Sequence, residues 1–116
     1  MPTDIFDSCV RASNDIAGVF EYDGDVGYFY LYEVGGDTGE KVLGSIHILS
    51  GTADFEQTDV SVRWDAGENK VGLFIRHELW AVFDGTQRIG YGGGYAVGAR
   101  ALIPPEVTSA FDVGRP

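Results

Sequence analysis

Two short apolar runs separated by three polar residues constrain the fold of this chain most strongly. The runs are VGLFI at 71–75 and LWAVF at 79–83, with the polar residues at 76–78 between them. Because every position of both runs is apolar, we expect two central strands with both faces covered. So few residues join them that they should pair as antiparallel neighbours in a hairpin, with Trp80 and Phe83 largely buried.

Gly and Asp recur at short intervals along the chain and separate segments rich in β-branched and aromatic residues, the pattern of sequential antiparallel strands. The segment DVSVRWD at 59–65 alternates, which predicts one face toward the core and one toward water. We predict strands near 17–22, 26–34, 42–49, 59–65, 70–76, 78–84 and 88–97. The expected fold is a single all-β domain over 1–116, an antiparallel meander forming a sandwich or a partly open barrel.

The two ends of the chain differ from this strand pattern. Residues 103–111, which begin Ile-Pro-Pro-Glu, predict one short C-terminal helix, since Pro suits a first helical turn and Glu the positive helix end. Too short to stand alone, it should cap an end or an open edge of the sheet. The apolar residues of the first dozen positions fit a helical stripe or a strand equally well.

Charge narrows the class of partner. The 116 residues carry a formal net charge of −10, which repels the phosphates of nucleic acids and anionic membranes. The acidic surface serves solubility or attracts a basic protein partner. An edge strand could also pair two copies into a homodimer.

Few residues offer metal or redox chemistry. Cys9, His47 and His77 lie far apart without the short spacings of a zinc site, so we expect no metal and no cofactor. The glycines of GYGGGYAVG match neither a dinucleotide-binding nor a P-loop pattern, and favour a bulge, a barrel corner or close packing under an aromatic ring. With one cysteine and no apolar run of membrane-spanning length, a cytoplasmic location is expected.

Two groups of residues are candidate sites. Arg76, His77 and Glu78 at the expected hairpin tip form either a solvated turn or a group able to polarise a substrate and exchange its protons. The segment VGYFYLYEV places Tyr28, Tyr30 and Tyr32 on one strand face, a row that suits a ligand cavity, a protein interface or a half-exposed sheet.

The chain resembles a known family through three segments that occur in the same order: VFEYDGDVGYFY, VLGSIHI and VSVRWDAGENKVGLFIRHELWAVFD. Across residues 19 to 84 it resembles DUF2251, small bacterial domains of unknown function. Members of that family carry a His where this chain has Trp80, and a Cys-Arg pair after the following turn where this chain has glycines. The resemblance implies a compact bacterial domain and no mechanism.

The leading functional hypothesis is a non-catalytic binding module that holds a basic protein, as an immunity or inhibitor protein would. The alternative is a small-molecule-binding β-barrel or a hydrolase, with a pocket near the tyrosine row or the His77 tip.

Overall fold

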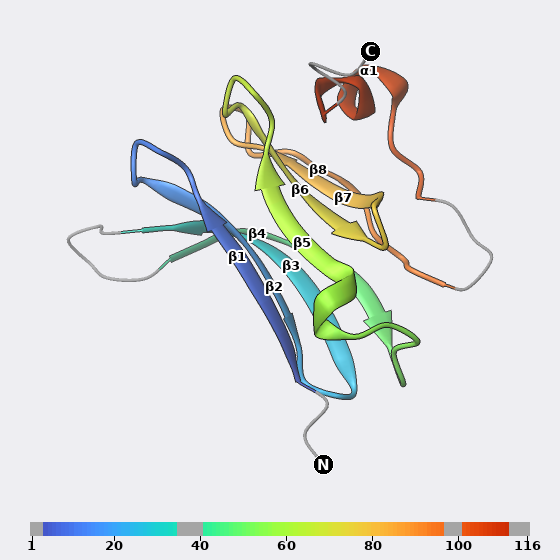
Figure 1. Cartoon of the computed structure of the whole chain (residues 1–116). Coiled ribbons are helices and arrows are strands. Elements are labelled where there is room, and N and C mark those ends of the chain that lie inside the picture. Colours follow the sequence, from blue (N-terminus) through green and yellow to red (C-terminus); the bar gives the residue numbers. More distant parts are fainter. Residues whose placement is uncertain (1–3, 35–40, 97–100, 112–116) are drawn as a thin grey trace.

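The computed structural model describes residues 4–34, 41–96 and 101–111. Two four-stranded antiparallel sheets, in the orders β1-β2-β3-β4 and β5-β6-β7-β8, form the two layers seen in Figure 1. The elements are β1 (Ile5–Val10), β2 (Ile16–Tyr22), β3 (Val26–Glu33), β4 (Lys41–Ser50), η1 (Gln57–Asp59), β5 (Val60–Trp64), β6 (Lys70–Ile75), β7 (Glu78–Asp84), β8 (Gly90–Gly92), α1 (Pro105–Thr108) and η2 (Ser109–Phe111). This confirms the predicted all-β antiparallel meander, its sandwich form and its short C-terminal helix.

The hairpin of β6 and β7 forms as predicted. The strands pair antiparallel, with Val71 opposite Phe83 and Leu73 opposite Ala81. Trp80 is 2% exposed and Phe83 is 3% exposed. The two apolar runs therefore supply much of the core.

Close contact between the two sheets requires a glycine at position 18. A Cβ at Gly18 of β2 would meet the side chains of Val71 on β6, Val62 on β5 and Phe29 on β3. The missing side chain lets β2 pack directly on β5 and β6. Phe29 is fully buried.

Side chains join the two sheets along the seam between their edge strands β1 and β5. The side-chain amide of Gln57 accepts a hydrogen bond from the Phe6 backbone N–H and donates one to the Phe6 carbonyl, at 3.0 and 2.8 Å. The backbone N–H of Val62 donates to Asp7 at 2.9 Å, and the indole of Trp64 donates to the Cys9 carbonyl at 2.9 Å. Backbone groups of both edges are thus satisfied by side chains, a protection against pairing with other chains.

The glycine run joins the sheets at the opposite seam. Gly93 donates a backbone hydrogen bond to Trp80 of β7 at 2.8 Å, and Tyr95 donates one to Ile48 of β4 at 2.6 Å. Gly92, Gly93 and Gly94 have φ of 87°, 97° and 66°, the left-handed region that favours glycine. The predicted strand at 88–97 is therefore shortened to β8, and residue 97 lies outside the described residues.

The C-terminal segment covers the outer face of the second sheet, rather than an end or an edge as the sequence suggested. The ring of Phe111 meets that of Phe74 edge-on, with centroids 5.5 Å apart, and Gly72 leaves room for it. Val107 is also buried. In Figure 1 the red segment accordingly lies on the side of β5–β8. None of the helices in the described part of the chain is long and apolar enough to cross a membrane.

Candidate functional site

The outer face of the first sheet carries the predicted tyrosine row. Tyr28, Tyr30 and Tyr32 lie on this face of β3, while Phe29 and Leu31 are buried on the other side. We call the surface the tyrosine face, and define it by Phe6, Val19, Glu21, Tyr28, Tyr30, Tyr32 and Val42. Strand register sets Phe6 opposite Glu21 and Glu21 opposite Tyr28.

Ring contacts order the centre of the tyrosine face. The rings of Tyr28 and Tyr30 stack, with centroids 5.9 Å apart and planes inclined by 25°. His47 of β4 meets the Tyr28 ring edge-on at 5.4 Å, and its Nε2 lies 2.9 Å from the hydroxyl of Ser50. Side chains held this way lose less freedom when a partner binds.

Large apolar side chains remain exposed around these rings. Phe6 is 54% exposed and Val42 is 52% exposed. The face holds two shallow hollows, of about 290 and 460 Å³, and both are lined by Phe6, Glu21 and Tyr30. An exposed apolar patch of this kind marks an interaction site more often than a single exposed residue does.

The tyrosine face has a negative rim. Asp4, Glu21 and Asp23 line the smaller hollow. Partial burial, and next the nearby negative charge of Glu21, raise the pKa of the Tyr30 phenol, so it stays neutral and can donate a hydrogen bond. No ion pair or hydrogen bond joins the Glu21 side chain to another described residue.

The hairpin tip at 76–78 is a tight turn. Arg76 and His77 have φ of 52° and 70°, so both occupy the left-handed region that such two-residue turns require. The guanidinium of Arg76 pairs with the carboxylate of Asp54 at 3.2 Å and with that of Asp59 at 3.6 Å. Arg76 therefore ties the tip to the loop that follows β4.

His77 and Glu78 lie apart from the tyrosine row, on the second sheet. Both are exposed and line a hollow of about 240 Å³ together with Arg63 and Phe111. Within the described ranges, no hydrogen bond or ion pair joins His77 to another residue. The structure thus gathers the predicted residues into two separate places.

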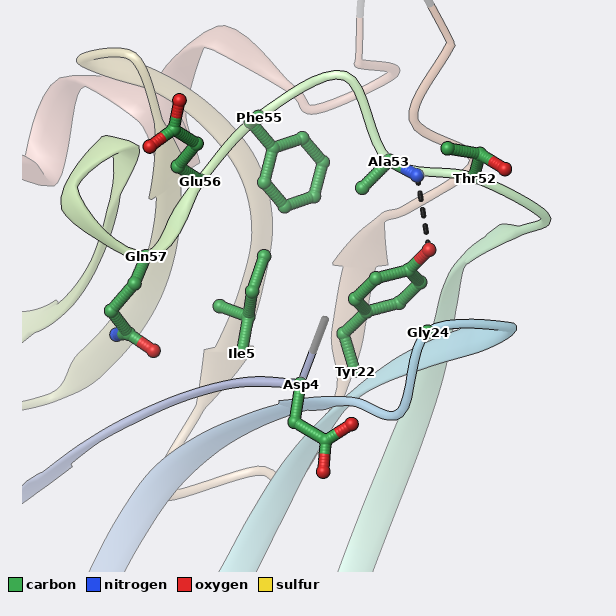
Figure 2. Close-up of a pocket in the computed structure, with 9 residues that line it drawn as sticks. All are labelled: Asp4, Ile5, Tyr22, Gly24, Thr52, Ala53, Phe55, Glu56 and Gln57. Atoms are coloured by element: carbon green, nitrogen blue, oxygen red, sulfur yellow. Dashed lines mark hydrogen bonds between the residues drawn. The ribbon is translucent and has the colours of Figure 1, made fainter. Parts of the chain in front are cut away.

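A fourth hollow, of about 360 Å³, lies at one end of the sandwich and is shown in Figure 2. The apolar parts of Ile5, Tyr22 and Phe55 form its interior. The Tyr22 hydroxyl accepts a hydrogen bond from the Ala53 N–H at 3.0 Å and donates one to Gly51 at 2.7 Å. In Figure 2 the carboxylate of Asp4 points away from the Phe55 ring, so the interior presents mainly apolar surface.

The described residues 4–34, 41–96 and 101–111 contain no group of three or more His, Cys, Asp or Glu arranged to hold a metal ion. In the same part of the chain, no buried side-chain nitrogen or oxygen lacks a hydrogen-bond partner.

Sequence reasoning missed four members of the tyrosine face: Phe6, Val19, Glu21 and Val42. A signal for Glu21 existed, because the Asp-Gly-Asp turn at 23–25 fixes the register of the two strands beside it. Counting back from that turn sets Glu21 opposite Tyr28, as observed. The positions of Phe6 and Val42 depend on how β1 pairs with β2 and β4 with β3. No comparably short turn in the sequence fixes the register of those two pairs.

Residues 3–96 match the model of a family described as uncharacterized proteins conserved in bacteria, DUF2251. Neither the curated proteins nor the solved structures contain a significant match to the chain.

Proposed function

The chain belongs to the DUF2251 family of uncharacterized bacterial proteins, and we propose that it is a non-catalytic binding module that holds a basic protein on its tyrosine face. An inhibitor or immunity protein works in this way. The lone cysteine, which cannot form an intramolecular disulfide, supports a cytoplasmic setting.

The observation that carries the proposal is the difference between the two outer faces of the sandwich. The chain covers the face of β5–β8 with its own C-terminal segment, through Phe111 on Phe74. The face of β1–β4 instead exposes Phe6 and Val42 around ordered tyrosine rings. Aromatic residues are enriched at protein interfaces because they combine large apolar area with a polar tip.

Charge indicates the kind of partner. The net charge of −10 attracts a basic protein over distance, and Asp4, Glu21 and Asp23 place negative charge beside the aromatic rings. Among the side chains that the structure describes, the basic ones are those of Arg11, Arg63, Lys70, Arg76 and Arg88, and none of them lines either hollow of the tyrosine face. A basic surface would therefore meet no described cation there.

The test compares two variants that add the same charge on opposite sheets. Val42→Asp places a carboxylate among the apolar residues of the tyrosine face, whereas Ser61→Asp places one at an exposed position of β5. Both proteins serve as bait in lysate of the source organism, and the captured partner is purified and its affinity for each bait is measured. We expect a basic partner that binds Ser61→Asp like the parent and loses at least about tenfold in affinity for Val42→Asp. An acidic partner, or equal affinity for both variants, would overturn the proposal.

A second candidate function rests on the hollow at the end of the sandwich. Its volume of about 360 Å³ and its interior of Ile5, Tyr22 and Phe55 suit a small apolar molecule. Titration with indole, followed through the backbone amide signals of Tyr22 and Ala53, tests this idea. Saturable shifts confined to these residues would support it, and unchanged spectra would exclude indole-like ligands.

A further inference from the structure

The smaller hollow of the tyrosine face has the composition of a cation site within an aromatic surface. Glu21 stands in a cross-strand row between Phe6 of β1 and Tyr28 of β3. Its carboxylate is exposed and pairs with no described residue. A carboxylate flanked by two aromatic rings would interrupt a purely apolar interface, because a buried charge without a partner is costly.

The shape of the hollow narrows the kind of cation that would pair with Glu21. At about 290 Å³ it is open to the surface and is walled on one side by the stacked rings of Tyr28 and Tyr30. A cation that enters from a partner protein brings an apolar stem, which can lie along Phe6. The faces of tyrosine rings attract a cation placed over them.

Arginine meets these conditions better than lysine. Its guanidinium is planar, stacks on aromatic rings, and binds a carboxylate through two parallel hydrogen bonds, whereas the ammonium of lysine is a compact and strongly hydrated point charge. The rim carboxylates of Asp4 and Asp23 add further negative charge. Asp23 already accepts the backbone N–H groups of Asp25 and Val26. Of the other two rim carboxylates, Glu21 is the one that stands between Phe6 and Tyr28.

We infer that the hollow between Phe6, Glu21 and the Tyr28–Tyr30 pair receives an arginine side chain of the partner protein. This inference rests on the proposed function, because it names the group by which the tyrosine face recognises its basic partner. The guanidinium pairs with Glu21 and stacks on the tyrosine rings, while its methylene stem covers Phe6.

The probe is N-acetyl-arginine amide, titrated into the intact protein while backbone amide signals are recorded. N-acetyl-lysine amide tests the preference for a guanidinium, and N-acetyl-citrulline amide has the same shape without the charge. We expect saturable shifts at Glu21, Tyr28 and Tyr30, about threefold weaker binding of the lysine compound and at least about tenfold weaker binding of the citrulline compound. Equal binding of the arginine and lysine compounds, or shifts that map elsewhere, would overturn the inference.

Glu21→Gln keeps the size of the side chain and removes its charge. Since Glu21 is exposed, the variant should fold, and its amide spectrum shows directly whether it does. Its affinity for the arginine compound should fall at least about fivefold, while the matched variant Glu106→Gln, on α1, should bind like the parent. Unchanged affinity in Glu21→Gln contradicts the inference.

The two proposals fail in different ways. If Val42→Asp loses the captured protein but the arginine compound does not bind, the tyrosine face is an interface and the arginine site is wrong. If the arginine compound binds at Glu21 but the captured protein ignores Val42→Asp, the proposed function is wrong and the arginine site stands.

Discussion

The phenol oxygen of Tyr95 lies 2.5 Å from a carboxylate oxygen of Asp54, across 41 residues of sequence. Arg76 pairs with the same carboxylate and also donates to the backbone carbonyl of Asp54. The Tyr95 ring packs edge-on against Trp80 and Phe55, at 4.7 and 5.1 Å. Tyr95, at the end of the glycine run, thus contacts the loop after β4 and strand β7, and Asp54 connects it to Arg76 at the hairpin tip.

Replacing Tyr95 with Phe should lower the free energy of unfolding by about 1 kcal/mol at neutral pH, because one hydrogen bond to a charged but partly exposed acceptor is lost. Urea denaturation of parent and variant measures this difference. Tyr91→Phe, on β8, is the control, since no hydrogen bond of the Tyr91 hydroxyl to another described residue is present. Equal losses of unfolding free energy in Tyr95→Phe and Tyr91→Phe would show that the hydrogen bond to Asp54 does not stabilise the fold.

The Tyr95–Asp54 hydrogen bond also predicts how the stability difference between the parent and Tyr95→Phe changes with pH. The Tyr95 hydrogen bond, and then the Arg76 contact, lower the pKa of Asp54, so its contribution holds above the ordinary aspartate value and is lost as pH falls through the folded value. Burial, and then Asp54, raise the pKa of Tyr95 to about 12, so its contribution holds below about pH 10 and is lost as pH rises through 12. Urea denaturation across this range should show a plateau between the two limits. A difference that grows at either extreme would contradict this assignment.

Gln57 is expected to protect the edge of β1. Gln57→Ala removes both hydrogen bonds to the Phe6 backbone and should cost about 1 kcal/mol, since water can replace them at this exposed edge. The sharper readout is hydrogen exchange, in which the Phe6 amide should exchange faster in the variant. Gln87→Ala, in the turn before β8, serves as the control. An unchanged exchange rate at Phe6 would show that Gln57 does not seal the edge.

Gly18→Ala tests the close contact between the sheets. The added methyl would meet Val71, Val62 and Phe29 inside the core, so overpacking should cost about 1 to 3 kcal/mol. In Gly67→Ala the methyl would meet only the end of the exposed Asn69 side chain, so a much smaller loss is expected. Thermal and urea denaturation of both variants compare the two sites. Similar stability of the two variants would mean that the side chains around Gly18 shift to accommodate the added methyl.

The sequence predicted the elements whose signals are local. The runs at 71–75 and 79–83 identified a central hairpin because every position is apolar. The first strand was ambiguous because apolar and polar residues are mixed on its two faces. Ile5 is buried, but Phe6 and Val10 face solvent, while Asp7 points toward the second sheet and accepts a hydrogen bond from the Val62 N–H. An apolar residue facing out and an acid facing in conceal the alternation on which strand prediction depends.

The candidate site was predicted in part for the same reason. The tyrosine row follows from the two-residue period of one strand, so a single segment of sequence contains it. Glu21 joins the row only through the register of β2 and β3, and Asp54 meets Tyr95 and Arg76 only in the folded chain. Contacts between distant segments depend on packing, which no local pattern encodes.

The last prediction distinguishes two contributions to binding of the captured partner: long-range charge attraction, which acts on the association rate, and side-chain contacts, which act on the dissociation rate. Tyr30→Ala removes a ring that lines both hollows, so it should weaken binding by about 1 to 3 kcal/mol, mainly through faster dissociation. Raising salt from low to physiological strength should instead slow association, because screening shortens the reach of the −10 charge on the chain. Surface-plasmon kinetics at several salt concentrations measure both rates, and Tyr91→Phe on the other sheet controls for general damage. If salt changes only the dissociation rate, long-range charge attraction does not set the association rate. If Tyr30→Ala leaves the dissociation rate unchanged, the tyrosine face is not the centre of the interface.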